Sequence, residues 1–213
     1  KCSARNNGLP SARSDLFRAE QWRGCCLVAL GARWGGVVDH RFAGRYHALT
    51  SAVTQLSPID PTPLMHLAIE QARLAEVGGD VPIGCVVVHQ PTGRVIGVGH
   101  NRRERDNDPA GHAEIIAMRQ AGQALGTWRL DECVLVVTLE PCPMCAGAIV
   151  NARLNRLIYG CDDPKAGAVR TLYQICDDAR LNHRVAIERG VLAEECGRLL
   201  SGFFKKQRAL GKK

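Results

Sequence analysis

The sequence lacks a run of apolar residues long enough to cross a bilayer. Of its 213 residues, 46% are hydrophobic, but the best candidate for a span, residues 25–38, is short and interrupted by Arg33. A membrane helix needs roughly 18 or more consecutive apolar residues. We therefore expect no transmembrane helix, and a globular chain that buries its apolar residues in a core.

The regular cysteine spacing of a disulfide framework is also missing. The chain has ten cysteines, but they are scattered through long stretches of ordinary hydrophobic sequence. This pattern favours a reducing compartment, which we take to be the cytoplasm, with some thiols on a metal and the rest in the core. The cysteines that we expect as buried thiols are Cys85, Cys133, Cys161, Cys176 and Cys196.

Acidic residues and hydrophobic periodicity are scarce in the first part of the chain. Residues 1–58 are rich in Arg, Ala, Gly and Ser and show no sustained period of 3.6 or 2. We interpret them as an extension, either a disordered leader without function or a targeting peptide whose apolar part is Cys25–Leu30. Residues 59–213 are predicted to form one domain.

Helical and strand patterns alternate through this domain, which is typical of a layered α/β fold. Thr62 is expected to cap a first helix that has Pro63 at its first position and stops at Gly78. A hairpin of strands 83–90 and 94–101 and a charged loop, 101–111, should follow. The remaining expected elements are a helix at 112–124, a buried strand at 133–140, a helix at 142–153, strands at 154–161 and 185–191, and a helix at 192–210 with Leu199, Leu200, Phe203 and Phe204 on its apolar side.

Two cysteines follow a proline in the segment LEPCPMC, residues 139–145. Pro141 is expected to start a helix, which would place Cys142 and Cys145 on one face of its first turn. Free backbone N–H groups and the helix dipole favour thiolates at that position. The segment therefore predicts two anionic sulfur ligands that converge on one point.

A third ligand is available in His112, within GHAEIIAMR. Two thiolates and an imidazole suit zinc, and no fourth candidate occurs at matching spacing. Because structural zinc is normally closed by four protein ligands, three ligands predict a catalytic zinc that keeps one place for water. Zinc lowers the pKa of bound water from 15.7 to about 7, so a nucleophile is available at neutral pH.

The nucleophile needs a proton carrier, and Glu114 is the carboxylate nearest to His112 in the sequence. Residues two apart in mid-helix do not face each other. We therefore expect His112 at the helix N-terminus with non-helical dihedral angles, so that both side chains reach one point. Singly, each motif has an ordinary interpretation: a structural histidine, a redox CxxC or a larger zinc site, and a glutamate that complements the helix dipole. Together they indicate zinc.

The spacing H-x-E followed by P-C-x-x-C resembles the signature of zinc nucleobase deaminases. In that class hydroxide attacks carbon 4 of cytosine or carbon 6 of adenine while the glutamate moves protons. The resemblance implies that Glu114 is the catalytic residue and that His112, Cys142 and Cys145 are the ligands of one zinc ion per subunit.

Longer strings resemble the bacterial tRNA-specific adenosine deaminases, over about residues 63–208 and not over the first sixty or so. The strings are DVPIGCVVV, GHNRRERDNDPAGHAEIIAMR, VLVVTLEPCPMCAGAIVNAR, LIYGCDDPKAGAV, LNHRV and LLSGFFKKQR. The resemblance implies an α/β, cytidine deaminase-like fold of three α-β-α layers with a five-stranded mixed sheet, and a homodimer. It also implies hydrolytic deamination of adenosine to inosine at the wobble position of a tRNA anticodon.

The same resemblance implies how the RNA is bound. Asn101 would hydrogen-bond the flipped base through its amide, although an Asn after a strand is more often a turn residue. A net charge of +7 makes a polyanion a plausible partner. The candidates for contacts to the anticodon-stem backbone are Arg102, Arg103, Arg105, Lys165, Lys205, Lys206 and Arg208. Each is at least as easily explained as part of a solvated basic face.

The DDPKAGA segment and the CxxC depart slightly from the family pattern. Asp163 corresponds to a position near the substrate backbone, or else caps the following turn. Cys161 and Asp162 precede it, and Asp162 adds negative charge near the expected RNA path. Pro143 lies inside the CxxC, and none of these departures removes a ligand.

Three alternatives remain open at this point. The chain could deaminate a free nucleobase or nucleoside of the guanine or cytosine type, although its basic C-terminal helix argues against this. It could be a non-catalytic tRNA-binding subunit, although such subunits commonly lose the glutamate that this chain keeps at Glu114. It could hold a purely structural zinc, which requires a fourth protein ligand.

Overall fold

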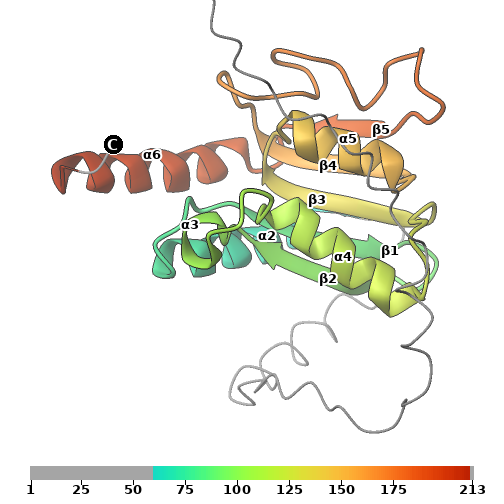
Figure 1. Ribbon diagram of the computed structural model, residues 1–213, viewed down its shortest axis with the longest axis horizontal. Helices are drawn as coiled ribbons and strands as arrows, with labels where there is room; N and C mark the ends of the chain where they lie inside the picture. The colour runs from blue at the N-terminus through green and yellow to red at the C-terminus, as the bar shows by residue number, and fades with distance from the viewer. Residues whose placement is uncertain (1–59, 212–213) are drawn as a thin grey trace, which may run out of the picture. The chain divides into compact units, whose positions relative to one another are not determined.

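The structure is a computed structural model that describes residues 60–211 (Figure 1). The expected N-terminal extension, residues 1–58, lies outside the described residues, as does the candidate targeting segment within it. None of the helices in the described part is long and apolar enough to span a membrane.

A five-stranded mixed sheet forms the middle of the domain. Its strands are β1 (Gly84–His89), β2 (Arg94–His100), β3 (Cys133–Leu139), β4 (Arg156–Cys161) and β5 (Ala186–Arg189), in the order β2-β1-β3-β4-β5. Strand β1 pairs antiparallel with both neighbours, whereas β3, β4 and β5 run parallel. The carboxyl ends of β2, β3 and β4 therefore meet at the same edge of the sheet.

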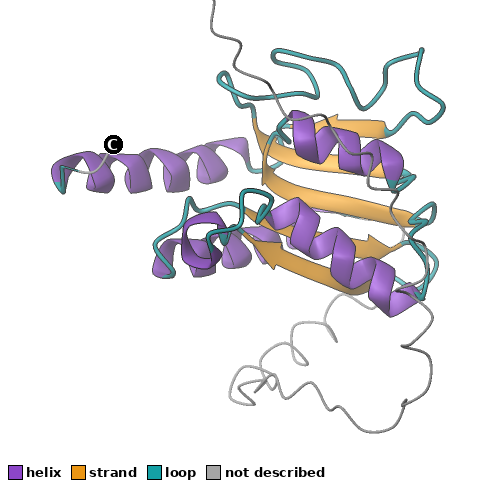
Figure 2. Cartoon of the chain, viewed as in Figure 1, coloured by secondary structure: helices purple, strands orange, loops and turns teal. Residues whose placement is uncertain are grey.

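Helices cover both faces of this sheet (Figures 1 and 2). They are α2 (Pro61–Val77), α3 (Arg103–Asp106), α4 (Ala113–Leu125), α5 (Pro143–Asn151) and α6 (Ala193–Ala209). Helices α4 and α5 pack on one face, and α2 and α6 pack on the other. The predicted three-layer α-β-α architecture is confirmed.

Alternation along the central strands explains why two cores form. Val86 and Val88 of β1 pack with α2, whereas Cys85 and Val87 of the same strand pack with α4 and α5. Successive side chains of a strand point to opposite faces, so a strand buried on both sides is apolar throughout. Each fully buried Val, Leu or Ile contributes roughly 1.5–3 kcal/mol of transfer free energy.

Two glycines of β2 let α4 lie very close to the sheet. A Cβ at Gly97 would sit 2.2 Å from the carbonyl oxygen of Ala117, and one at Gly99 would sit 2.2 Å from that of Ala113. Neither distance is possible for a real side chain, so only glycine allows this packing. The close approach brings the first turn of α4 beside the end of β2.

Two expectations for the part of the chain before α4 were wrong. Helix α2 begins at Pro61 and not Pro63, because Asp60, rather than Thr62, is the cap and accepts a hydrogen bond from the Thr62 N–H at 2.9 Å. Part of the segment expected as a charged loop forms the one-turn helix α3. Its start is fixed by Asp80, whose carboxylate accepts the backbone N–H groups of Glu104 and Arg105, each at 3.0 Å.

The cysteines outside the LEPCPMC segment are largely buried, as expected. Cys85, Cys133, Cys176 and Cys196 are buried and Cys161 is partly buried. None of the seven cysteines in residues 60–211 forms a disulfide.

Candidate active site

Two long helices begin at the edge of the sheet where β2, β3 and β4 end. His112 is the N-cap of α4 and has extended dihedral angles, φ −85° and ψ 149°. This confirms that the histidine precedes the helix, so that it and Glu114 in the first turn can face one point. Cys142 is the N-cap of α5 and is also extended, with φ −72° and ψ 172°.

Helix α5 begins at Pro143, and the expectation that Pro141 starts it was wrong. The fixed φ of a proline suits the first helical position, and the residue before a proline is driven out of the helical region. Cys142 therefore stays outside the helix while Cys145 lies in its first turn. The proline inside the CxxC thus sets the geometry of both cysteines.

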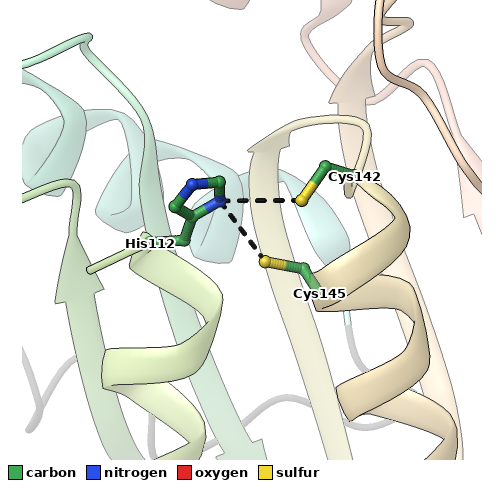
Figure 3. A group of neighbouring side chains, drawn as sticks. All are labelled: His112, Cys142 and Cys145. Atoms are coloured by element: carbon green, nitrogen blue, oxygen red, sulfur yellow. Dashed lines mark hydrogen bonds between the residues drawn. The ribbon is translucent and has the colours of Figure 1, made fainter. Parts of the chain in front are cut away.

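Three side chains converge between the two helix starts (Figure 3). Nδ1 of His112 lies 3.7 Å from Sγ of Cys142 and 3.6 Å from Sγ of Cys145. All three ligand atoms lie within 4.8 Å of one another. For tetrahedral zinc with bonds of about 2.3 Å to sulfur and 2.05 Å to nitrogen, the N···S separation is about 3.6 Å. The cluster could therefore hold a metal ion, and its spacing fits zinc.

The cluster has three members and not four. Within residues 60–211 no further His, Cys, Asp or Glu joins His112, Cys142 and Cys145 in a metal-binding group. A closed structural zinc site needs a fourth protein ligand, whereas a catalytic site leaves one position for water or substrate. The donor set therefore suits a catalytic metal.

The two cysteine thiols of the cluster differ in acidity. The pKa of Cys142 is lowered to about 4, chiefly because Cys145 and then His112 donate hydrogen bonds to its sulfur. The pKa of Cys145 is raised, because it is the donor in that bond and because it is buried. The hydrogen bond to Cys142 also raises the pKa of His112. The hydrogen bonds to Cys142 therefore favour a thiolate in this pair.

Glu114 lies in the same pocket, 3% exposed. Burial raises the pKa of its carboxyl group, and the nearby His112 partly offsets this rise. A carboxyl group whose pKa is shifted toward neutrality suits proton transfer better than an ordinary surface carboxylate. Its position in the first turn of α4 also lets it face the cluster.

A cavity of about 410 Å³ opens beside this cluster. Volumes of 300–1,000 Å³ are typical of small-molecule sites. His112, Glu114 and Cys142 line its floor together with Asn101, which follows β2. The Asn101 side chain is 6% exposed, and its Oδ1 accepts the N–H of Ala113 at 3.1 Å. Among the described residues only this oxygen of the amide is engaged, so the amide nitrogen can donate into the cavity.

Comparison with known proteins decides the family. The sequence pattern of MafB19-like deaminases matches residues 59–208. The chain is 46% identical over 144 residues to the tRNA-specific adenosine deaminase of Bacillus subtilis (strain 168), which covers 68% of this chain and 88% of that one. It is 44% identical over 145 residues to the enzyme of the same name from Haemophilus influenzae, covering 68% and 83%.

The chain belongs to the tRNA-specific adenosine deaminase family.

Two solved structures are similar to this chain. A structure from work on A-to-I editing by tRNA:A34 deaminases at the wobble position is 43% identical with a TM-score of 0.61, and covers 64% of this chain and 98% of that one. The protein NE0047, solved with 2,6-diaminopurine, is 25% identical with a TM-score of 0.59, covering 68% and 81%.

The rim of the deaminase cavity holds some of the predicted basic residues and not others. Arg103 of α3 and Lys165 line the cavity from two different segments. Arg102 instead pairs with Asp106 at 2.8 Å, and it is not part of the cavity wall. Arg105 is also absent from the wall.

Asp163 lines the cavity and also caps a turn. Its Oδ1 accepts the backbone N–H groups of Lys165 at 2.9 Å and Ala166 at 3.2 Å. The simpler interpretation from the sequence, a turn cap, is therefore present in the structure. The neighbouring Asp162 is exposed and lines the same cavity.

Helix α6 contributes apolar side chains to the cavity of the deaminase, and not its predicted basic ones. Leu200 and Phe204 line the cavity, and Phe204 is 40% exposed. Lys206 pairs with Glu76 of α2 at 2.7 Å. Lys205 and Arg208 are exposed and lie outside the cavity wall. The C-terminal part of α6 runs beyond the sheet (Figure 1).

Two buried carboxylates near the cavity were missed by sequence reasoning. Asp80 and Glu140 are each 2% exposed, and both belong to the cavity wall. Asp80 caps α3, and Glu140 accepts hydrogen bonds from the segment that carries Asp163. Neither belongs to a spacing motif, but Glu140 lies two residues before Cys142, and a charged residue after a buried strand is a signal in itself.

A second, apolar hollow of about 830 Å³ lies between α4 and α5, away from the catalytic cluster. Its wall includes Ile115, Met118, Trp128, Leu130 and Ala148. Trp128 is 64% exposed, which is unusual for such a large aromatic side chain. None of the three residues of the candidate metal site lines this hollow.

Proposed function

We propose that this chain deaminates adenosine to inosine hydrolytically at the wobble position of a tRNA anticodon, with one zinc ion per subunit. The observation that carries the proposal is the His112, Cys142 and Cys145 cluster with the buried Glu114 beside it, in a chain of this family. The relatives are named tRNA-specific adenosine deaminases, and a similar solved structure comes from work on tRNA:A34 deaminases.

His112, Cys142 and Cys145 would hold the zinc ion, which would supply an activated water by lowering its pKa to about 7. Glu114 would take a proton from the nucleophile and deliver it to the ring nitrogen next to carbon 6 of adenine. The same carboxylate would then take the second proton, from the hydroxyl group on carbon 6, and deliver it to the amino group, which leaves as ammonia. Its burial within the cavity keeps bulk water from competing for these protons.

Asn101 would orient the base. Because its Oδ1 is held by the Ala113 N–H, its amide nitrogen points its donors at a purine acceptor. The hydrogen bond from Ala113 also ties the base-binding residue to the first turn of α4, which carries Glu114. The first turn of α4 would thus position both the residue that binds the base and the residue that carries the proton.

The rest of the tRNA would be bound through phosphate contacts. Arg103 and Lys165 at the cavity rim are the best placed candidates. Arg102, Lys205, Lys206 and Arg208 would contact the anticodon stem farther away, and Asp163 would shape the loop next to the substrate backbone. Sequence-specific RNA binding usually takes splayed bases from single-stranded loops, which suits an anticodon.

The functional unit would be a homodimer in the cytoplasm, as the resemblance implies. The apolar hollow between α4 and α5 supports a second copy as its occupant, since an exposed Trp128 in an apolar wall is typical of an interface. The unpaired thiols of the described cysteines suit a reducing compartment. Light scattering after size exclusion would measure the mass, and a monomer at micromolar concentration would contradict the dimer.

The proposed function is tested by sequencing tRNA before and after incubation with the purified protein. Inosine is read as guanosine, so the expected result is an A-to-G change at the first anticodon position of a tRNA that carries adenosine there. Ammonia release from free guanine, cytidine and adenosine is measured in parallel. Turnover of a free base without tRNA editing would favour the free-nucleobase alternative instead.

A further inference from the structure

Glu140 is a fully engaged carboxylate outside the catalytic cluster. It follows β3, is 2% exposed, and both of its oxygens accept hydrogen bonds. Oε1 accepts the backbone N–H groups of Val169, Arg170 and Thr171 at 3.0, 2.7 and 3.0 Å. A buried carboxylate with this many donors has no capacity left for a metal or a substrate.

The other oxygen of Glu140 reaches the cavity rim. Oε2 accepts the backbone N–H of Asp163 at 3.0 Å and the hydroxyl of Thr171. Glu140 therefore accepts hydrogen bonds from both ends of the segment 163–171, which carries Asp163 and Lys165. We call this segment the rim loop.

The rim loop wraps tightly around the carboxylate. A Cβ on Gly167 would lie 2.3 Å from Glu140 Oε2, so only glycine allows the loop to pass so close. The Ala168 N–H donates to the carbonyl of Pro141 at 2.9 Å. Residues 140 and 141, which lead directly into Cys142, thus hold the loop through both a side chain and the backbone.

The far end of the loop is also held by packing, because Ala168 and Val169 are fully buried members of the core cluster that includes α4 and α5. Asp163 bonds within the loop, to the N–H groups of Lys165 and Ala166, which sets its local shape without fixing its place on the protein. The ion pair of Arg170 with Asp177, at 2.9 Å, joins it to the following segment. At the cavity end of the loop, the described hydrogen bond that joins Asp163 to the segment leading into Cys142 is therefore the one from its N–H to Glu140.

We propose that Glu140 is a positioning residue for the substrate. It holds the rim loop, with Asp163 and Lys165, at a fixed place relative to Cys142. The wall that faces the RNA is therefore already formed before the nucleotide enters. This rests on the proposed function, because the rim loop matters to catalysis only if an RNA strand passes over it. Preorganisation lowers the cost of ordering the loop on binding. Its loss therefore raises KM more than it lowers kcat.

The variants Glu140→Gln and Thr171→Val test this. Gln keeps one oxygen for the three N–H groups and presents an NH2 group to the Asp163 N–H and the Thr171 hydroxyl, so the Asp163 link fails first. Thr171→Val removes one hydroxyl without touching the backbone donors. The matched control is Asp178→Asn, because Asp178 also caps a loop N–H, that of Arg180 at 2.9 Å, but does not line the cavity.

Steady-state editing of an anticodon stem-loop, zinc content and the melting temperature are measured for all four proteins. We expect KM to rise about tenfold in Glu140→Gln and two- to threefold in Thr171→Val, with kcat within threefold of wild type, one zinc per chain, and Asp178→Asn unchanged. Should Glu140→Gln fail to fold, Thr171→Val still decides through its KM.

This design distinguishes a failure of the positioning role from a failure of the proposed function. An unchanged KM in both variants, or a loss of activity only in proportion to lost zinc or lost folded protein, would overturn the positioning role. A wild-type protein that edits no RNA would overturn the proposed function itself. A fall in kcat with KM unchanged would also contradict the inference, since it would place Glu140 with the reacting groups.

Discussion

The cavity has a floor and a rim, and they are held in place in different ways. The floor is formed by Asn101, His112, Glu114 and Cys142. His112, Glu114 and Cys142 lie at the starts of α4 and α5, which pack on the sheet. The rim is formed by Arg103, Asp163 and Lys165, which lie on a one-turn helix and a loop. The floor is fixed by the main core, whereas single buried carboxylates, Asp80 and Glu140, hold the start of α3 and the Asp163 end of the rim loop.

This difference predicts two kinds of mutational response. In the proposed function the floor residues would act on the reacting atoms together, so removing one of them is expected to remove the reaction. The rim residues would act on RNA binding, and each would contribute only part of the binding free energy. Changes should therefore be all-or-none at the floor and graded at the rim.

The largest effect is expected for Glu114→Ala. Without the carboxyl group no described side chain in the cavity floor is placed to move the proton, and kcat should fall by at least about 10³-fold, near the upper range of general acid–base effects. Zinc content and tRNA binding should stay at wild-type levels, measured by metal analysis and filter binding. Glu132→Ala, at a 70% exposed carboxylate, is the control. Retained turnover would mean that another residue carries the proton.

The next effect is expected for Cys145→Ser. A serine hydroxyl is a much poorer zinc ligand than a thiolate, so the metal content should fall and activity should fall with it. Cys161→Ser is the matched control, because its sulfur donates to the Thr138 carbonyl at 3.6 Å and belongs to no metal cluster. Metal analysis and editing rates are measured on the same samples. Full zinc occupancy in Cys145→Ser would contradict its role as a ligand.

A third substitution, Gly99→Ala, tests the packing that holds α4 against the sheet and leaves the side chains of the cavity floor unchanged. Gly99→Ala places a Cβ against the Ala113 carbonyl, 2.2 Å away, and must push α4 from the sheet. We expect a loss of about 1–3 kcal/mol in the free energy of unfolding, together with weaker zinc binding, because α4 begins next to His112. Gly147→Ala is the control, since nothing lies within 4 Å of a Cβ there. In mid-helix it should leave stability unchanged or raise it by up to about 1 kcal/mol. Denaturant unfolding measures both.

The difference between floor and rim also explains which parts of the site could be predicted from the sequence. His112 and Glu114 lie two residues apart, which is possible for one site only at a helix end, so the floor followed from local geometry. The start of α5 was misplaced because Pro141 and Pro143 both suit a first helical position. The restraint that Pro143 places on Cys142 decides between them.

The supports of the rim could not be predicted in this way. Asp80 and Glu140 act by accepting backbone N–H groups that lie more than 20 residues away in the sequence, and any residue type can supply such a donor. No side-chain pattern records the contact. Arg102 shows a related limit, since its charge suggested RNA contact but did not reveal that its guanidinium also pairs with Asp106.

The smallest effects are expected at the rim, for Arg103→Ala and Lys165→Ala. Each removes one candidate phosphate contact, so KM for the anticodon stem-loop should rise a few-fold while kcat stays the same. The slope of log affinity against log salt should fall in magnitude by about 0.7 for each charge removed from contact with a single strand. Arg180→Ala is the control, because this arginine is 89% exposed and paired with Asp178 away from the cavity. An unchanged salt slope for Arg103→Ala would show that this side chain is solvated and does not contact a phosphate. Lys165 would then be the remaining candidate for a phosphate contact at the rim.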